Sequence, residues 1–183
     1  KYALFDKACG LDHYDMAEYI LINYDFDLNT LTNHSYAPSI LHKIFKYTNI
    51  FNEKNIELIK LIINDPRTNV NILNINNITP FYYATMNESI PDSLFDFLLN
   101  HDKINVNISN ELGASPFYNS CEKNNYKIVE KMLENNKVDV NKPNKYGETP
   151  LHIACLKLQY ETIKLLLDSD RIDITDFPPK LFF

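Results

Sequence analysis

Several patterns that mark well-known protein classes are missing from this 183-residue chain. No apolar run approaches the roughly 18–20 residues that a membrane-spanning helix needs, so we expect no transmembrane segment and no insertion into a membrane. There is no P-loop, GxGxxG, HExxH or CxxC motif, and so no signature of nucleotide binding, zinc-dependent hydrolysis or dithiol chemistry. The chain begins at Lys1 and shows no signal-peptide pattern, so we expect it to be part of a longer protein.

Positive charge is also sparse. The chain has 18 basic residues against 24 acidic ones, a net charge of −6, and only Arg67 and Arg171 are arginine. These basic residues are scattered, whereas a protein that binds nucleic acid needs them clustered in one patch, so we expect no nucleic-acid partner. Hydrophobic residues make up 45% of the chain, which is typical of a folded domain.

A motif recurs along the chain, and internal repeats decide the fold more directly than composition does. The clearest copies are TPLHIAC at 149–155, SPFYNSC at 115–121 and TPFYYAT at 79–85, with weaker relatives SILHKIF at 39–45 and ALFDKAC at 3–9. Their second positions are spaced by 36, 40, 36 and 34 residues. A second landmark keeps the same phase, as DLN at 27–29, NVN at 69–71 and 105–107, DVN at 139–141 and DIT at 173–175. The chain therefore contains five related units.

The residues of the last unit show what each unit builds. Thr149 is suited to cap the N-terminus of a helix, and Pro150 to be its first residue, where the missing N–H has no helical partner to lose. Apolar residues then recur with helical spacing in two successive segments, which predicts two helices with one buried stripe each. The first stripe is Leu151, Ala154 and Cys155, and the second is Ile163, Leu166 and Leu167.

The other units repeat these signals. Ser39, Thr79 and Ser115 occupy the cap position of Thr149. Gly113 and Gly147 precede their caps in a turn where a positive φ is expected, and Asn77 holds that place in the third unit.

The pattern N-x-x-G-x-T-P-L-H-x-A-C, followed by two helices and D-V-N, resembles the ankyrin repeat. The resemblance covers about residues 2–175 and is most specific in the last two units. It implies an all-α solenoid of stacked helix-turn-helix units joined by β-hairpin-like turns. We expect one domain, with units at about 2–29, 30–71, 72–107, 108–141 and 142–175 and a tail at 176–183.

Some units depart from the family pattern. Unit two has extra residues between its helices near Lys46–Asn55, which predicts a longer loop or lengthened helices there, and unit three has two extra around Ile90–Pro91. The family usually has Gly at the inter-helix turn, where this chain has Asp12, Asn124 and Leu158. We expect strain or a reshaped turn at Leu158. In the tail, Pro178–Pro179 excludes another regular helix, and we expect the apolar end to pack on unit five or on chain outside this sequence.

Cysteine and histidine are common in catalytic and metal sites, but their positions in the repeat favour a structural role here. Cys9, Cys121 and Cys155 share one position in their units, where the family has a small buried residue. Helices of adjacent layers pack about 8–10 Å apart, beyond the roughly 7 Å Cα separation that a disulfide spans, so we expect structural thiols and an intracellular, reducing location. His152 and Cys155 lack an oriented third group, so we expect no enzyme, no cofactor and no metal.

Asn29, Asn71, Asn107 and Asn141 recur at the end of the second landmark and have two interpretations. Their side chains are expected to bond the backbone of the turn, as Asn commonly does. The family resemblance also implies that such asparagines can be hydroxylated by a dedicated oxygenase.

The resemblance implies that a protein or peptide partner binds along the concave face formed by the hairpin tips and first helices. Large apolar residues at exposed tips are typical of interfaces, with charged residues around them setting partner choice. We expect no small-molecule substrate, because a stack in which each unit touches only its neighbours should lack a deep pocket. The candidate partner-binding residues are Tyr36, Tyr47, Ile75, Ile78, Met86, Glu111, Leu112, Lys123, Lys145, Tyr146, Glu148 and Lys157.

The sequence therefore predicts a non-catalytic protein-interaction module. Two alternatives stay open at this point: a regulatory or substrate-targeting arm of a larger enzyme whose catalytic domain lies outside this chain, and a structural spacer.

Overall fold

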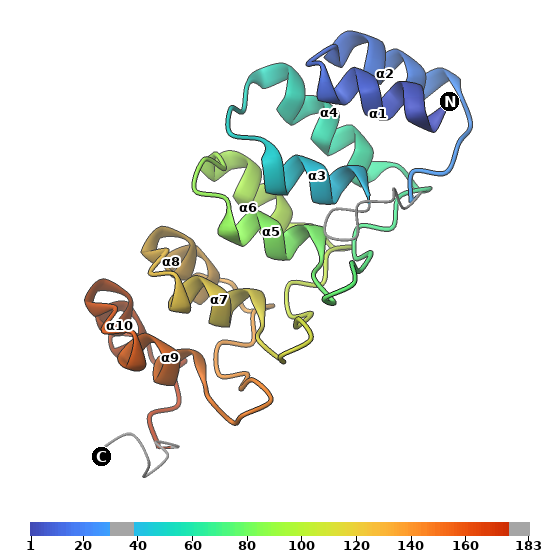
Figure 1. Cartoon of the computed structure of the whole chain (residues 1–183). Helices are drawn as coiled ribbons and strands as arrows, with labels where there is room; N and C mark the ends of the chain where they lie inside the picture. Colours follow the sequence, from blue (N-terminus) through green and yellow to red (C-terminus); the bar gives the residue numbers. More distant parts are fainter. Residues whose placement is uncertain (30–38, 176–183) are drawn as a thin grey trace.

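Paired helices stacked in a row make up the chain (Figure 1). The computed structural model describes residues 1–29 and 39–175, which contain ten α-helices and no strand. Odd-numbered helices form one layer, even-numbered helices form the other, and the connections between units project from the side next to the odd-numbered layer. The helices are α1 (Tyr2–Gly10), α2 (Tyr14–Asn23), α3 (Ile40–Tyr47), α4 (Glu53–Asn64), α5 (Pro80–Met86), α6 (Asp92–Asn100), α7 (Pro116–Glu122), α8 (Tyr126–Glu134), α9 (Pro150–Leu156) and α10 (Tyr160–Leu167).

Helix starts follow the predicted caps. The hydroxyls of Ser39, Thr79, Ser115 and Thr149 each accept the backbone N–H three residues further on, at 3.1–3.4 Å. Proline is the first residue of α5, α7 and α9. The unusual length of unit two is also confirmed, because residues 48–52 separate α3 from α4.

One continuous core runs through the stack and is built from the predicted stripes. The stripe of α9 is buried at Leu151 and Ala154, and that of α10 at Leu166. The prediction for Leu167 is wrong, because its side chain is 56% exposed at the end of the described stack. Cys9 and Cys155 are half-buried rather than buried, while Cys121 is fully buried, and all three are free thiols.

Left-handed backbone occurs at the predicted turns. Gly113, Gly147 and Asn77 have positive φ before their caps, and Asp12, Asn124 and Leu158 have it between the two helices of their units. Leu158 is the residue least suited to this conformation, because its Cβ lies close to the following carbonyl, which destabilises the fold by roughly 1–2 kcal/mol. Its side chain is exposed, so little packing offsets that strain.

Replacing Leu158 by glycine should therefore stabilise the protein. We expect Leu158→Gly to raise the free energy of unfolding by about 1 kcal/mol, after subtracting the flexibility that glycine adds to the unfolded chain. Urea unfolding measures the change. Leu156→Gly is the matched control, since Leu156 is also exposed but lies in α9, where glycine should destabilise by about 1 kcal/mol. A loss of stability at position 158 would show that its turn is not strained.

The tail and one predicted contact residue lie outside the described residues, namely 176–183 and Tyr36. Among the helices of the described ranges, none is long and apolar enough to cross a membrane.

Candidate protein-interaction surface

Three hairpin tips are built in the same way by an asparagine. In each, the side-chain oxygen of Asn74, Asn110 or Asn144 accepts the backbone N–H groups two and four residues further on, at 2.9–3.0 Å. The backbone N–H of the same asparagine donates to the carbonyl four residues on. The side chain therefore closes a tight turn whose outermost residues point away from the helices.

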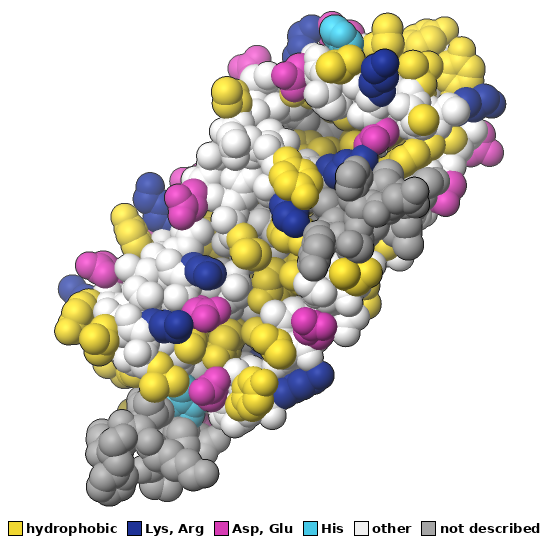
Figure 2. Space-filling view, viewed as in Figure 1, with side chains coloured by type: hydrophobic (Ala, Val, Ile, Leu, Met, Phe, Trp, Pro, Cys, Tyr) yellow, Lys and Arg dark blue, Asp and Glu magenta, His cyan; other side chains and the backbone are white. Residues whose placement is uncertain are grey.

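Backbone hydrogen bonds join these tips into a ladder. The N–H of Glu111 donates to the carbonyl of Asn76 at 2.9 Å, and the N–H of Lys145 donates to the carbonyl of Leu112 at 3.0 Å. Consecutive tips therefore lie side by side, with Ile75 61%, Leu112 50% and Tyr146 73% exposed. Hydrophobic and charged side chains are interspersed over the face seen in Figure 2. We call Ile75, Leu112 and Tyr146 the tip ladder.

Some of the remaining predicted contact residues are exposed, and others are half-buried or interact with neighbouring side chains. Tyr47, Met86, Glu111, Lys123 and Lys145 are exposed as expected.

Ile78, in contrast, is half-buried and packs against the core, so the prediction that it belongs to an exposed apolar row is wrong. Glu148 is half-buried, and its carboxylate accepts hydrogen bonds from Tyr118 at 3.2 Å and Asn144 at 2.7 Å. Burial and the nearby Glu148 raise the pKa of the Tyr118 hydroxyl, which keeps it a donor. Lys157 is exposed and lies 3.9 Å from Glu122.

The four landmark asparagines bond the neighbouring unit. The side-chain amide of Asn107 donates to the carbonyl of Lys137 at 2.6 Å, and its oxygen accepts the N–H of Asp139 at 2.9 Å. Asn29, Asn71 and Asn141 make the same pair of bonds to the next unit. The prediction that these side chains bond turn backbone is therefore confirmed, but the turn that each one bonds belongs to the following unit.

The sequence analysis missed a second row of cross-unit bonds. It is made by basic residues that lie four positions before the last residue of the second landmark in units two to five. Arg67, Lys103, Lys137 and Arg171 each donate to carbonyls at the C-terminal end of the preceding unit's second helix. These carbonyls lack helical partners, and the helix dipole makes that end negative. Both arginines of the chain are used in this way.

Histidine also links units. In α3, Nδ1 of His42 lies 2.8 Å from the Ser39 hydroxyl and Nε2 lies 2.9 Å from the carbonyl of Ile78 in the next unit. Because a carbonyl only accepts, Nε2 carries the proton. Burial lowers the pKa of His42, which favours this neutral form. In α9, Nδ1 of His152 accepts the N–H of Thr149 at 3.0 Å. His42 therefore joins two units, whereas the bond between His152 and Thr149 lies within one unit and completes the cap of α9.

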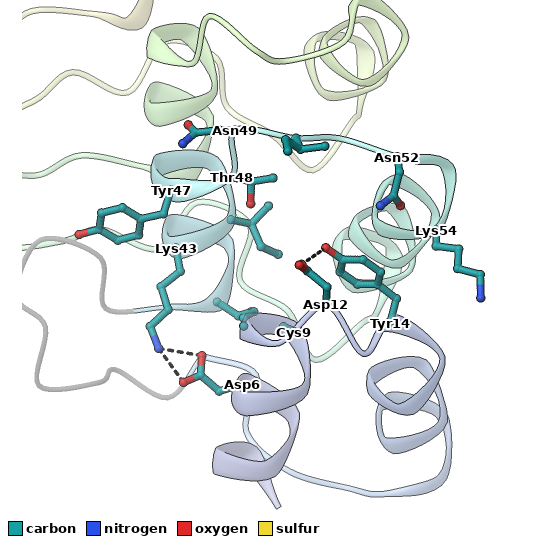
Figure 3. Close-up of a pocket in the computed structure, with 14 residues that line it drawn as sticks. Asp6, Cys9, Asp12, Tyr14, Lys43, Tyr47, Thr48, Asn49, Asn52 and Lys54 are labelled. Carbon is teal, nitrogen blue, oxygen red and sulfur yellow. Dashed lines mark hydrogen bonds and ion pairs between the residues drawn. The ribbon is translucent and has the colours of Figure 1, made fainter.

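A cleft of about 770 Å³ lies between units one and two. Figure 3 shows α1 on one side of it and α3 with the loop 48–52 on the other. The stack therefore has an open cleft at this junction, which the sequence did not predict. Its cause is the longer loop of unit two, which contributes Thr48, Asn49, Ile50 and Asn52 to the lining.

A family model described as ankyrin repeats, in three copies, matches residues 47–144 and 91–177, which together span more than half of the chain. The chain belongs to the ankyrin repeat family. A search of curated proteins gave no match. Ankyrin repeats are in general protein-interaction modules and are typically non-catalytic, and the fold described above is an ankyrin stack with an enlarged second repeat.

Proposed function

We propose that this ankyrin stack binds a protein or peptide partner reversibly through its tip ladder and the exposed ends of the first helices. The observation that carries this proposal is the row of large apolar side chains at Ile75, Leu112 and Tyr146, held outward on consecutive tips. Because at least half of each side chain stays exposed in the folded chain, these side chains contribute little to its stability. Aromatic and aliphatic side chains of this kind are typical anchors of protein interfaces.

The construction of the tips supports this function. Each turn is closed by an asparagine and bonded to its neighbour, so the contact residues are fixed before a partner arrives. A rigid surface loses less conformational entropy on association, which favours affinity. Glu111, Lys123 and Lys145 surround the apolar row with both signs of charge, an arrangement that affects partner choice and encounter rate. In this proposal the stack itself catalyses no reaction and acts inside the cell.

Affinity capture from source-cell lysate tests this surface. We expect the unmodified chain to retain a protein that Leu112→Ala/Tyr146→Ala does not, because the double variant removes two of the three large apolar side chains of the tip ladder. Binding should weaken by about tenfold or more, as expected for truncated interface anchors.

The matched control is Tyr19→Ala/Ile22→Ala, which removes exposed apolar side chains of similar size from α2. Circular dichroism checks that both variants fold. If the tip variant retained the partner and the α2 variant lost it, the binding surface would lie on the outer helices and the proposal would be wrong.

A further inference from the structure

Within residues 1–29 and 39–175, the junction between units one and two lacks a contact that closes the other three junctions. At those junctions an amide side chain from the inter-helix turn donates to carbonyls at the C-terminal end of the preceding first helix. Asn87 bonds Phe45 and Thr48 at 2.9 Å each, Asn125 bonds Thr85 at 3.4 Å, and Gln159 bonds Glu122 at 3.1 Å. Among the described residues, no side chain of unit two makes such a bond to the end of α1.

Two amides of the unit-two loop bond within that loop, although the amide of Asn55 also donates to the Tyr14 hydroxyl of unit one at 3.4 Å. Asn52 and Asn55 cap α4 reciprocally, and the amide of Asn55 also donates to the carbonyl of Ile50 at 3.0 Å.

Gly10 occupies in α1 the position that Glu122 occupies in α7, whereas Phe45 and Thr85 correspond to Cys9. Within the described ranges the carbonyl of Cys9 accepts the N–H of Asp12 at 3.4 Å, while that of Gly10 accepts no hydrogen bond. Gly10 lines the cleft, so this acceptor lies where a ligand can reach it.

A carboxylate beside that acceptor lacks a cation. Asp12 follows α1 and lines the cleft, where its side chain accepts a hydrogen bond from the Tyr14 hydroxyl (Figure 3). The two lysines of the lining are paired elsewhere, Lys43 with Asp6 and Lys54 with Asp15, both at 2.7 Å. Asp12 forms no ion pair with any described residue. The C-terminal end of α1 carries the negative end of the helix dipole, so it and the Asp12 carboxylate both make the potential here negative.

The opposite wall of the cleft mixes polar residues, among them Thr48 and Asn49, with two isoleucines. Ile44 comes from α3 and Ile50 from the loop, and both line the cavity. Ile50 is 79% exposed, and Tyr47 beside it is 60% exposed. Ile50 therefore leaves most of its apolar side chain free to contact a ligand in the cleft.

The protein itself shows that a basic side chain fits a helix end next to a carboxylate. Lys137 donates to the carbonyl of Asn100 at 3.0 Å and to the carboxylate of Asp102 at 3.1 Å. Arg67 makes a larger set of such bonds. Arg67 donates to the carbonyls of Leu21 and Tyr24 at the end of α2, and to the carboxylate of Asp65 at 2.6–2.9 Å. The planar guanidinium supplies several donors in fixed directions, which a lysine ammonium does not.

We propose that the cleft between units one and two binds an arginine side chain of a peptide segment in a partner protein. Its guanidinium donates to the Gly10 carbonyl and the Asp12 carboxylate, and an apolar residue next to the arginine packs against Ile44 and Ile50. This site goes beyond the tip ladder, and it shares only Tyr47 with the surface proposed above.

Titration of the ¹⁵N-labelled chain with two blocked peptides tests the site by NMR. The probes are acetyl-Ala-Leu-Arg-Leu-Ala-amide and the same peptide with Gln in place of Arg. We expect the Arg peptide to give saturable shifts at Gly10, Asp12 and Ile50, and the Gln peptide to bind about tenfold more weakly or not at all, because it cannot make charge-assisted bonds. Shifts centred elsewhere, equal binding of both peptides, or no saturable shift would each overturn the proposal.

Asp12→Asn removes the charge with little risk to the fold, because asparagine adopts the left-handed conformation readily and unit four already has Asn124 at this place. It should weaken Arg-peptide binding about tenfold, to the level of the Gln peptide. The matched control is Asp168→Asn, an exposed carboxylate that also follows a helix end but lies outside the cleft. Leu112→Ala/Tyr146→Ala should leave peptide binding unchanged, so failure of the tip surface and failure of the cleft remain distinguishable.

Discussion

Gly113→Ala should lower the free energy of unfolding by about 3 kcal/mol. Gly113 has a φ of +81°, a conformation that strains any residue with a Cβ by roughly 1–2 kcal/mol. A Cβ here would also lie 2.7 Å from the backbone nitrogen of Lys145 in the next tip. That nitrogen donates to the carbonyl of Leu112, so the clash would separate the two tips and break their bond. Overpacking of this kind typically adds 1–3 kcal/mol.

Gly147→Ala is the matched control, because Gly147 has nearly the same φ of +79° but nothing within 4 Å of the added Cβ. We expect this variant to lose only about 1 kcal/mol, the strain of the left-handed backbone alone. Urea unfolding of both variants separates the two contributions. Equal losses would mean that the contact between tips carries no energy.

The repeat was predictable because its signals are local. A hydroxyl followed by proline, as in Thr149–Pro150, fixes a helix start, and apolar residues with helical spacing then fix the buried face. Gly113 and Gly147 were predictable for the same reason, since a turn of this type needs positive φ at one residue.

Contacts between units were less predictable because they join residues some 30–40 positions apart. Asn107 was expected to hold its own turn, whereas it bonds Lys137 and Asp139 in the next unit. The prediction that Leu167 is buried was wrong, because an apolar stripe shows which face of a helix is hydrophobic but not whether another unit covers that face. The longer loop of unit two was expected, but the open carbonyl of Gly10 follows from comparing junctions in space. In units two to five a basic residue, Arg67, Lys103, Lys137 or Arg171, stands four residues before the last residue of the second landmark. This regular spacing was the one signal in the sequence that could have revealed the cross-unit bonds of these side chains.

Arg67→Met should have the second large effect, a loss of about 2 kcal/mol in the free energy of unfolding. The variant keeps an apolar stem of similar length but removes the bonds to the carbonyls of Leu21 and Tyr24 and to Asp65. Bonds to charged groups typically contribute 1.5–3 kcal/mol, and the partial exposure of the side chain, 30%, reduces what this set contributes. The guanidinium also lies 5.6 Å from the centre of the Phe26 ring, a further contact that methionine weakens.

Lys103→Met is the control at the same place in the next unit. Lys103 makes a single long bond of 3.4 Å to the carbonyl of Asn64, so its loss should change stability by less than about 0.5 kcal/mol. A second readout distinguishes lost bonds from general loosening. Hydrogen bonding to Arg67 lowers the pKa of Asp65, and the charge of Lys103 lowers it to a lesser extent. NMR titration of Arg67→Met should therefore show that pKa rising toward the usual aspartate range, with a smaller rise in Lys103→Met. If both variants lost the same stability and neither moved the Asp65 pKa, the cross-unit cations would be surface charges rather than links between repeats.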